Sequence, residues 1–361
     1  MRVVFPAILD GFACTRASCA CRASLAAAPA TASGDGFPFR DTEAALLAGA
    51  AAVAHGAPSA AKTAATAHAD YPIIAIATPQ GAELTFSSLC PTVRSLLASN
   101  REPVALARAE GGWRCALRVF QPEGGLKEVR LTPRKTVPWA AFSATRDALL
   151  DLIAEPTLPL LARLARVAAL LDAALTDRNL PVPVPPLTAR GFLAFRGFVE
   201  SRTASAPTEA MARFAADALP LWGDDVGLTQ SDIPALLDAL AGDWRSHFRT
   251  WLVPTERDIA PAIEAWLGAR LFAIPLDRDQ SIARGYAEFF EGFAVALRYA
   301  AAFGEVRQQR INARMIVAAL ALGEHLVATA GESLPGFEMP RDVHERGPRM
   351  ADLDMTLESI C

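Results

Sequence analysis

Four stretches of the chain carry apolar residues at three- and four-residue steps, the spacing that places them on one face of a helix. They span residues 158–175, 263–274, 286–303 and 311–326. Each stretch predicts a helix that buries its apolar face. The residues that form these faces are Leu161, Leu164, Ala168, Leu171 and Leu175, then Ile263, Trp266, Leu267 and Leu271, then Tyr286, Phe289, Phe290, Phe293 and Leu297, and last Ile311, Met315, Ala319, Leu322 and Leu326.

Between residues 72 and 133 the pattern changes to short segments typical of β-strands. These segments read IIAIA, PVALARAE, WRCALRVF and KEVRLTP, and the EGGW and PEGG turns between them carry the glycines that tight hairpins need. A helix is expected to begin near Pro91, where Ser87 or Ser88 can cap it. The patterns together predict a mainly α protein, a multi-helix domain with a small β portion near residues 72–133.

Composition divides the chain into three parts. Residues 1–25 hold a cysteine motif, and residues 71–361 form the mainly helical domain with its small β subregion. Residues 26–70 are rich in Ala, Gly, Ser, Thr and Pro, and we expect them to be a low-complexity insertion or linker with little order. His55 and His68 lie in this passage, where solvent-exposed side chains are expected.

Length and charge exclude several classes of protein. The chain has 361 residues and 52% apolar content, enough to bury a large core, and a formal net charge of -4. It has no block of like charge, so we expect no nucleic-acid partner. No apolar run approaches the roughly 20 residues that a membrane span needs, so no membrane association is expected.

The first 32 residues have some features of a secretory leader, including an early Arg2 and a stretch of small residues. Asp10, Arg16 and Arg22, however, fall where a leader should be apolar or small. We therefore expect the N-terminus to stay in place and the protein to be cytoplasmic.

Three of the six cysteines lie close together in the stretch FACTRASCAC: Cys14, Cys19 and Cys21. Six cysteines are too few for a disulfide scaffold in a chain of this length. In an extended backbone Cys19 and Cys21 point to the same side, and Arg16 and Arg22 would favour the thiolate form that binds metals. A metal site and a chance grouping in an alanine-rich segment both remain open from these residues alone.

The other three cysteines lie far apart. Cys90 stands at the N-terminal end of the helix expected near Pro91, where the helix dipole stabilises a thiolate. Cys115 alternates with apolar positions and is expected to be a core residue of a strand. Cys361 is expected to lie on a frayed C-terminus.

Several stretches, taken in order, resemble one family, the flagellin lysine-N-methylases, which belong to the cysteine-cluster proteins of the zinc- or iron-chelating type. The family opens with a proline, an aromatic residue and two cysteines, similar to Pro6, Phe12, Cys14 and Cys19. A Ser-Cys-Pro followed by a helix rich in Leu and Ala is similar to LTFSSLCPTVRSLL, and its later helices resemble LPLLARLARVAALLDAAL, IEAWLGARLFAIP and ALRYAAAF. The family's Cys-Cys pair is reduced here to Cys21, which marks a diverged member.

The resemblance implies methyl transfer from S-adenosylmethionine to lysine side chains of flagellin. It also implies an iron-sulfur cluster, or another thiolate-bound metal, with Cys14, Cys19, Cys21 and Cys90 as the four ligands. Two alternatives stay open: a non-catalytic metal or iron-sulfur binding protein, and a helical protein-interaction module in which the cysteines are incidental.

Methyl transfer to lysine needs a neutral amine. A free lysine has a pKa of about 10.4, so a dry, aromatic-lined pocket and a nearby base are expected to remove its proton. We leave the catalytic base unassigned, because helical stripes of aromatic residues are usually packing. The residues on the late helices that could contribute are Tyr286, Tyr299, Glu288, Glu291 and His325.

Overall fold

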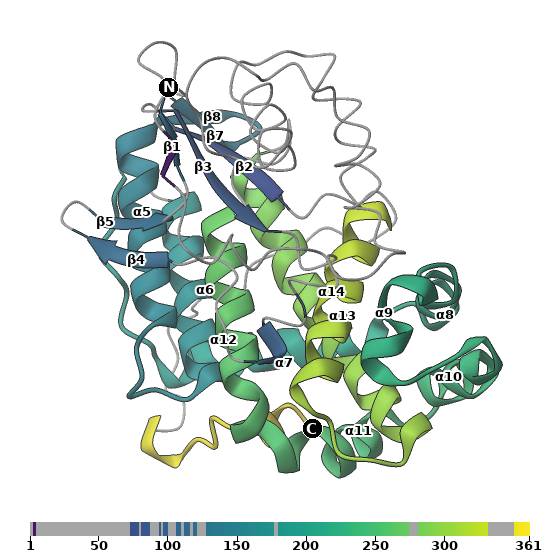
Figure 1. Cartoon of the computed structure of the whole chain (residues 1–361). Helices are drawn as coiled ribbons and strands as arrows, with labels where there is room; N and C mark the ends of the chain where they lie inside the picture. The colour runs from purple at the N-terminus through teal and green to yellow at the C-terminus, as the bar shows by residue number, and fades with distance from the viewer. Residues whose placement is uncertain are drawn as a thin grey trace, which may run out of the picture.

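The computed structural model confirms a mainly α protein with a small β portion (Figure 1). Most of the described chain is helical, and the strands come before the first long helix in sequence. The residues that the structure describes are 3–4, 73–78, 81–86, 94, 97–99, 106–109, 112–115, 118–120, 128–176, 180–273, 281–330 and 350–361.

The described strands pair antiparallel in three small sheets. A four-stranded sheet has the order β1-β6-β3-β2. The other two sheets have two strands each: β4 pairs with β5, and β7 pairs with β8. The bounds are β1 Val3–Val4, β2 Ile73–Thr78, β3 Gly81–Phe86, β4 Leu106–Ala109, β5 Gly112–Cys115, β6 Arg118–Phe120, β7 Glu128–Thr132 and β8 Lys135–Pro138.

Two details of the β portion differ from the prediction. Pro133 does not end it, because this residue lies in the turn between β7 and β8, and the first helix after the strands begins only at Trp139. A proline presets its own φ angle for such a turn, so the change of pattern at Pro133 marked a hairpin and not the end of the sheet. The segment WRCALRVF forms two strands, β5 and β6, which belong to different sheets.

The four predicted apolar stripes lie in or beside α6, α12, α13 and α14. Every stripe residue is buried except Leu175, which is partly buried against the core. Near the helix expected from Pro91, Arg94, Leu97 and Ala98 are helical. The bounds are α5 Trp139–Ile153, α6 Leu160–Thr176, α7 Ala189–Ser205, α8 Thr208–Asp217, α9 Leu219–Val226, α10 Ile233–Ala241, α11 Trp244–His247, the π-helical turn η3 Phe248–Leu252, α12 Glu256–Ala273, α13 Ile282–Arg307 and α14 Ala313–Ala330.

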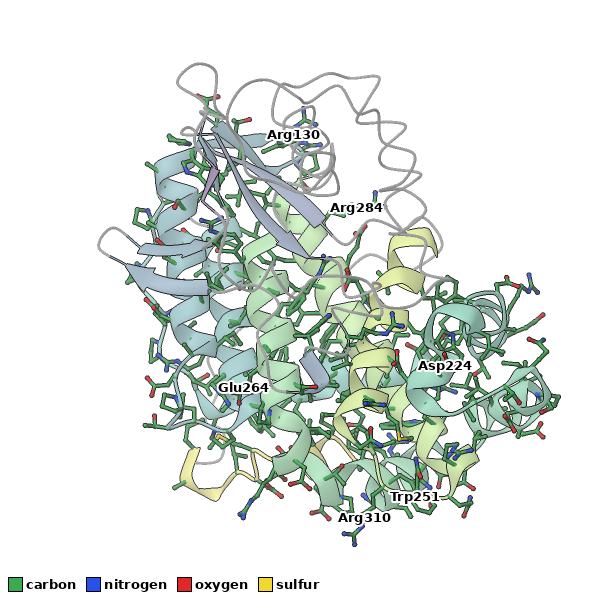
Figure 2. All side chains as sticks on the ribbon, viewed as in Figure 1. Arg130, Asp224, Trp251, Glu264, Arg284 and Arg310 are labelled. Carbon is green, nitrogen blue, oxygen red and sulfur yellow. The ribbon has the colours of Figure 1, made fainter. Side chains whose placement is uncertain are left out.

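Helix α13 is the centre of the core. It is 26 residues long, every residue from Phe289 to Gly304 is buried, and it packs on α14, α7, α10 and η3. Its first turns lie at the end of the bundle that carries the strands, where Arg284 is seen, and side chains fill the spaces between the helices (Figure 2). Among the described helices, none has the length and apolar character needed to cross a membrane.

The C-terminus is not frayed, contrary to the prediction. The last short helix, η7 Leu357–Ile360, packs on α7, and the side chains of Leu357 and Ile360 are fully buried. The Leu357 amide also donates to the Glu256 carboxylate at the start of α12, at 3.1 Å. Apolar contacts and this hydrogen bond hold the end of the chain on the bundle, and its local sequence could not reveal their distant partners.

Candidate functional site

The four predicted metal ligands, Cys14, Cys19, Cys21 and Cys90, lie outside the described residues. Structure is described on both sides of Cys90: β3 ends at Phe86, and the buried Arg94 forms a 2.8 Å ion pair with Asp225. Within the ranges given above, no three His, Cys, Asp or Glu side chains gather closely enough to hold a metal ion. The cysteine site therefore stays a prediction.

The structure places the other two cysteines in secondary structure or at its end. Cys115 ends β5, opposite Leu106 of β4, as expected for a strand residue. Cys361 is half-buried, and its thiol lies 3.9 Å from the Arg245 carbonyl oxygen. Burial raises the pKa of Cys361 to about 11, so this thiol stays protonated near neutral pH.

An aromatic cluster, formed by Phe195, Trp266, Phe289 and Phe290, packs around the first half of α13. Trp266 of α12 stacks on Phe289 with ring centroids 5.5 Å apart. Phe290 meets Phe289 edge to face at 5.0 Å and Phe195 of α7 at 5.7 Å. These rings make a dry environment, which disfavours charged groups.

Two buried tyrosines on α13, both proposed above as contributors to the base, differ in their hydroxyl groups. Tyr299 donates a 2.7 Å hydrogen bond to the Met211 carbonyl oxygen in α8. Tyr286 is 1% exposed, and its hydroxyl has no hydrogen-bond partner in the part of the chain that the structure describes. Burial raises the pKa of both phenols, and the Arg146 charge opposes this rise at Tyr286. Neither is a base near neutral pH in these surroundings.

The difference between the two tyrosine hydroxyl groups predicts that two matched substitutions change the stability of the protein unequally. Tyr299→Phe should lower the free energy of unfolding by about 1 kcal/mol, because it removes a buried hydrogen bond. Tyr286→Phe should leave that free energy unchanged or raise it, because it removes a buried hydroxyl that has no hydrogen-bond partner among the described residues. Urea unfolding of both variants measures the difference, and equal losses would contradict the assignment of the hydroxyl contacts.

The glutamates on α13 do not join Tyr286 in one site. Glu288 pairs with Arg284 one turn earlier, at 3.1 Å. Glu291 is buried 3.0 Å from Arg202 of α7, and burial raises its pKa while Arg202 opposes the rise. Five residues of helix turn Glu291 about 140° away from Tyr286. Tyr286 therefore lies on a different face of α13 from Glu288 and Glu291.

Glu324 and His325 are neighbours in α14, and two polar residues side by side on a helix suggest a surface pair, but Glu324 does not lie at the surface. Its carboxylate is 15% exposed, lies 3.0 Å from Arg270 and accepts a 3.3 Å hydrogen bond from the Trp266 indole. Glu324 faces α12 because α14 packs against that helix, and this packing depends on the tertiary fold. His325 lies in α14, but its side chain is outside the described part of the structure.

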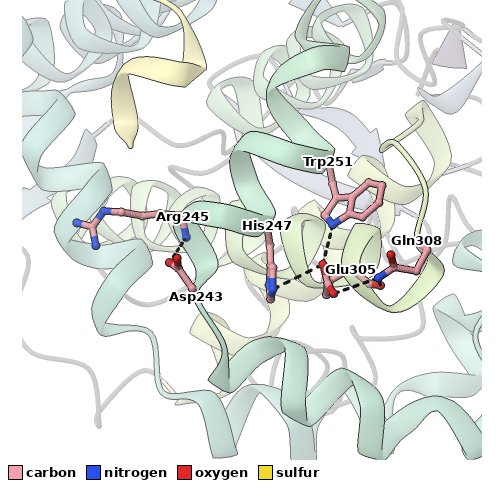
Figure 3. Close-up of polar contacts among 6 residues, drawn as sticks. All are labelled: Asp243, Arg245, His247, Trp251, Glu305 and Gln308. Carbon is pink, nitrogen blue, oxygen red and sulfur yellow. Dashed lines mark hydrogen bonds and ion pairs between the residues drawn. The ribbon is translucent and has the colours of Figure 1, made fainter.

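A second cluster, which is polar and is centred on Glu305, was not predicted (Figure 3). Glu305, near the end of α13, accepts hydrogen bonds from the Trp251 indole at 2.8 Å and the Gln308 amide at 3.0 Å. His247 Nε2 lies 3.6 Å from the same carboxylate. Gln308 ends α13 in the left-handed region, with φ 49°, so Glu305 joins this helix end to η3 and α11.

This second cluster connects α11, η3 and the end of α13. The Nδ1 atom of His247 is buried and has no hydrogen-bond partner among the described residues, so only Nε2 has a partner, Glu305. His247, Trp251 and Glu305 come from distant parts of the chain, and no sequence spacing announces their contact.

Comparison with known proteins assigns no function to the aromatic cluster or to the cluster centred on Glu305. No protein-family model matches the chain, and no curated protein or solved structure matches it significantly.

Proposed function

We propose that the chain is an S-adenosylmethionine-dependent protein-lysine N-methyltransferase that acts on flagellin. An iron-sulfur or other metal cluster would be held by Cys14, Cys19, Cys21 and Cys90. The observation that carries the proposal is the order of the motifs: the proline, aromatic and cysteine opening, then Cys90 and Pro91 before a helix in a segment similar to the family's Ser-Cys-Pro, then the Leu-rich helices.

The aromatic surroundings of α13 support the chemistry. Methyl transfer requires a lysine amine without its proton, and moving an ammonium group from water to a dry aromatic site disfavours its charge. Phe289 and Phe290 of the aromatic cluster and the buried Tyr286 offer such surroundings on one helix. The catalytic base stays unassigned, because Glu291, whose pKa is raised by burial, pairs with Arg202 on another face of α13.

The test is anaerobic purification followed by iron and sulfide analysis, binding of S-adenosylmethionine and methylation of flagellin. We expect bound iron and sulfide in the parent chain, and we expect Cys14→Ser and Cys90→Ser each to lose both together with methyl transfer. Four thiolates hold such a cluster and the proposed site has no spare ligand, so one substitution should suffice. Cys361→Ser is the matched control and should keep metal and activity.

The same experiment separates the alternatives. Metal binding without binding of S-adenosylmethionine would favour a non-catalytic metal protein. A parent chain that binds no metal when prepared without oxygen, or Cys14→Ser and Cys90→Ser variants that bind it like the parent, would overturn the cluster and favour a helical interaction module. Because thiolates stay free only in reducing surroundings, the proposal places the protein in the cytoplasm. A mature form beginning near Ala28 in a periplasmic fraction would contradict that location.

A further inference from the structure

The last described residues, 350–361, form a strap across one end of the helical bundle. In Figure 1 this yellow segment runs below α12 and ends near α11. Leu357 and Ile360 are fully buried, and Met350, Leu353 and Met355 are partly buried against the core. The strap is therefore attached along its length, mainly by apolar side chains.

Between α11 and α12 the chain forms an irregular helical segment. The π-helical turn η3 follows α11 directly and leads into a single 3₁₀ turn, η4 Val253–Thr255, after which α12 begins. A change of hydrogen-bond spacing within a helix often marks a hinge. Inside α12, Pro261 has no amide hydrogen to donate to the carbonyl oxygen one turn earlier. Regular α-helical hydrogen bonding is therefore interrupted both before and after the first turn of α12.

The strap contacts both sides of this irregular segment. After the segment, the Glu256 carboxylate at the start of α12 accepts a 3.1 Å hydrogen bond from the Leu357 amide. Before it, the Arg245 carbonyl oxygen in α11 lies 3.9 Å from the Cys361 thiol. The Arg245 guanidinium also pairs with Glu200 of α7, the helix on which η7 packs. The strap thus joins α12 to α11 across the segment.

The middle of the segment is held separately, on α13. The Trp251 indole of η3 donates to Glu305 at 2.8 Å, and the Trp251 carbonyl oxygen accepts a 3.0 Å hydrogen bond from the Ile311 amide. Because η3 is fixed there, a change of angle in the segment would move the start of α12 relative to η3. The hydrogen bond from Leu357 to Glu256 opposes this movement, since the strap is itself anchored in the core.

We propose that residues 248–255 are a hinge between α11 and α12, and that the strap is a brace that keeps this hinge in one arrangement. When the strap detaches, the hydrogen bond to Glu256 is lost and the first turn of α12 can change its angle to η3. The brace is independent of the proposed methyl transfer, because none of the predicted metal ligands and none of the candidate bases belongs to it.

Amide hydrogen exchange of the whole chain at low urea concentrations tests the brace. The Val253 amide, which donates to the Phe248 carbonyl oxygen across the π-helical turn, reports on the hinge, and the Leu357 amide reports on the strap. Since the hinge opens only after the strap detaches, the free energy of opening at Val253 should equal or exceed that at Leu357. Both should lie below the value at Phe293 in the core of α13, because the hinge opens without global unfolding.

A substitution in the strap tests the coupling. Ile360→Ala removes a fully buried side chain and changes no residue of the hinge, so the Leu357 and Val253 amides should both exchange faster by the same factor, about tenfold or more. Glu358→Ala alters an exposed side chain in the same turn. This matched control should leave both rates as in the parent chain.

Three results would overturn the brace. Faster exchange at Leu357 with an unchanged rate at Val253 in Ile360→Ala would show that the hinge moves without the strap. Unchanged rates at both amides would show that Ile360 does not anchor the strap. If Ile360→Ala does not fold, the parent chain decides: opening at Val253 with a lower free energy than at Leu357, or opening of both only together with Phe293, contradicts the proposal.

Discussion

Replacing Arg298 by methionine should destabilise the protein strongly, with a loss on the order of 4 kcal/mol in the free energy of unfolding. Arg298 is 6% exposed, and its guanidinium donates to the Thr203, Ala204 and Ala206 carbonyl oxygens at 3.0, 2.9 and 3.2 Å. It also donates to the Leu240 carbonyl oxygen at 2.6 Å and the Thr208 hydroxyl at 2.9 Å.

These acceptors explain the size of the effect. Thr203 and Ala204 lie in the last turn of α7 and Leu240 in the last turn of α10, where carbonyl groups have no partner within their own helix. A positive charge is also favourable at the negative end of a helix dipole. Methionine fills similar space but donates no hydrogen bond, so it would leave buried carbonyl oxygens without a donor.

Urea unfolding measures this loss, and two further variants calibrate it. Arg298→Lys keeps the charge but cannot reach all five acceptors, so it should be intermediate. Arg213→Met removes an exposed arginine, which pairs with Glu209 one turn away, and should change stability by less than about 0.5 kcal/mol. If Arg298→Met unfolds at the same urea concentration as Arg213→Met, the guanidinium does not hold these helix ends.

Replacing Gly323 by alanine should cost about 3 kcal/mol, because it forces α13 and α14 apart. An added Cβ would overlap the Gly292 carbonyl oxygen and lie 2.8 Å from the Ala296 backbone nitrogen. Both atoms belong to the backbone of α13, which cannot move aside as the end of a flexible side chain can. Alanine is intrinsically a better helix former than glycine by about 1 kcal/mol, and the expected loss exceeds that gain.

Two glycines provide the controls. An alanine Cβ at Gly292, across the same helix contact, would lie 3.2 Å from the Glu324 Cα atom, so its loss should be smaller. At Gly197 in α7, no described atom outside its own stretch of helix lies within 4 Å of an added Cβ, and alanine should stabilise the protein by up to about 1 kcal/mol. Thermal unfolding should therefore rank the melting temperatures as Gly197→Ala, Gly292→Ala and Gly323→Ala, from highest to lowest. A Gly323→Ala variant as stable as Gly197→Ala would contradict the close helix contact.

Only part of the candidate site could be predicted from the sequence. The tyrosines Tyr286 and Tyr299 could both be placed in the core, because they fall on or beside an apolar helical face. Their chemical difference could not be predicted, because the partner of Tyr299 is the Met211 carbonyl, 88 positions away. The contacts of Glu324 could not be predicted for the same reason: its partners, Trp266 and Arg270, come from another helix.

The amino-acid sequence by itself determined the main elements of this protein. The apolar faces of α6, α12, α13 and α14 could be predicted because a helix repeats every 3.6 residues, so neighbours along the chain already define the buried side. The β portion was visible for a similar local reason, in short apolar segments separated by glycine turns. Its true extent was not, since Pro133 is compatible with both a hairpin turn and a boundary.

Only the tertiary structure decided which buried polar groups find partners. Arg298 looks like an interruption in an apolar helix, yet it binds carbonyl groups that α7 and α10 leave open more than 50 positions away. The docking of the C-terminus on Glu256 and the close contact of Gly323 with α13 also depend on contacts between segments that are far apart in the chain. Hydrogen bonds and close packing depend on distances of a few ångströms between segments remote in the chain, and the order of residues along one segment carries no record of those distances.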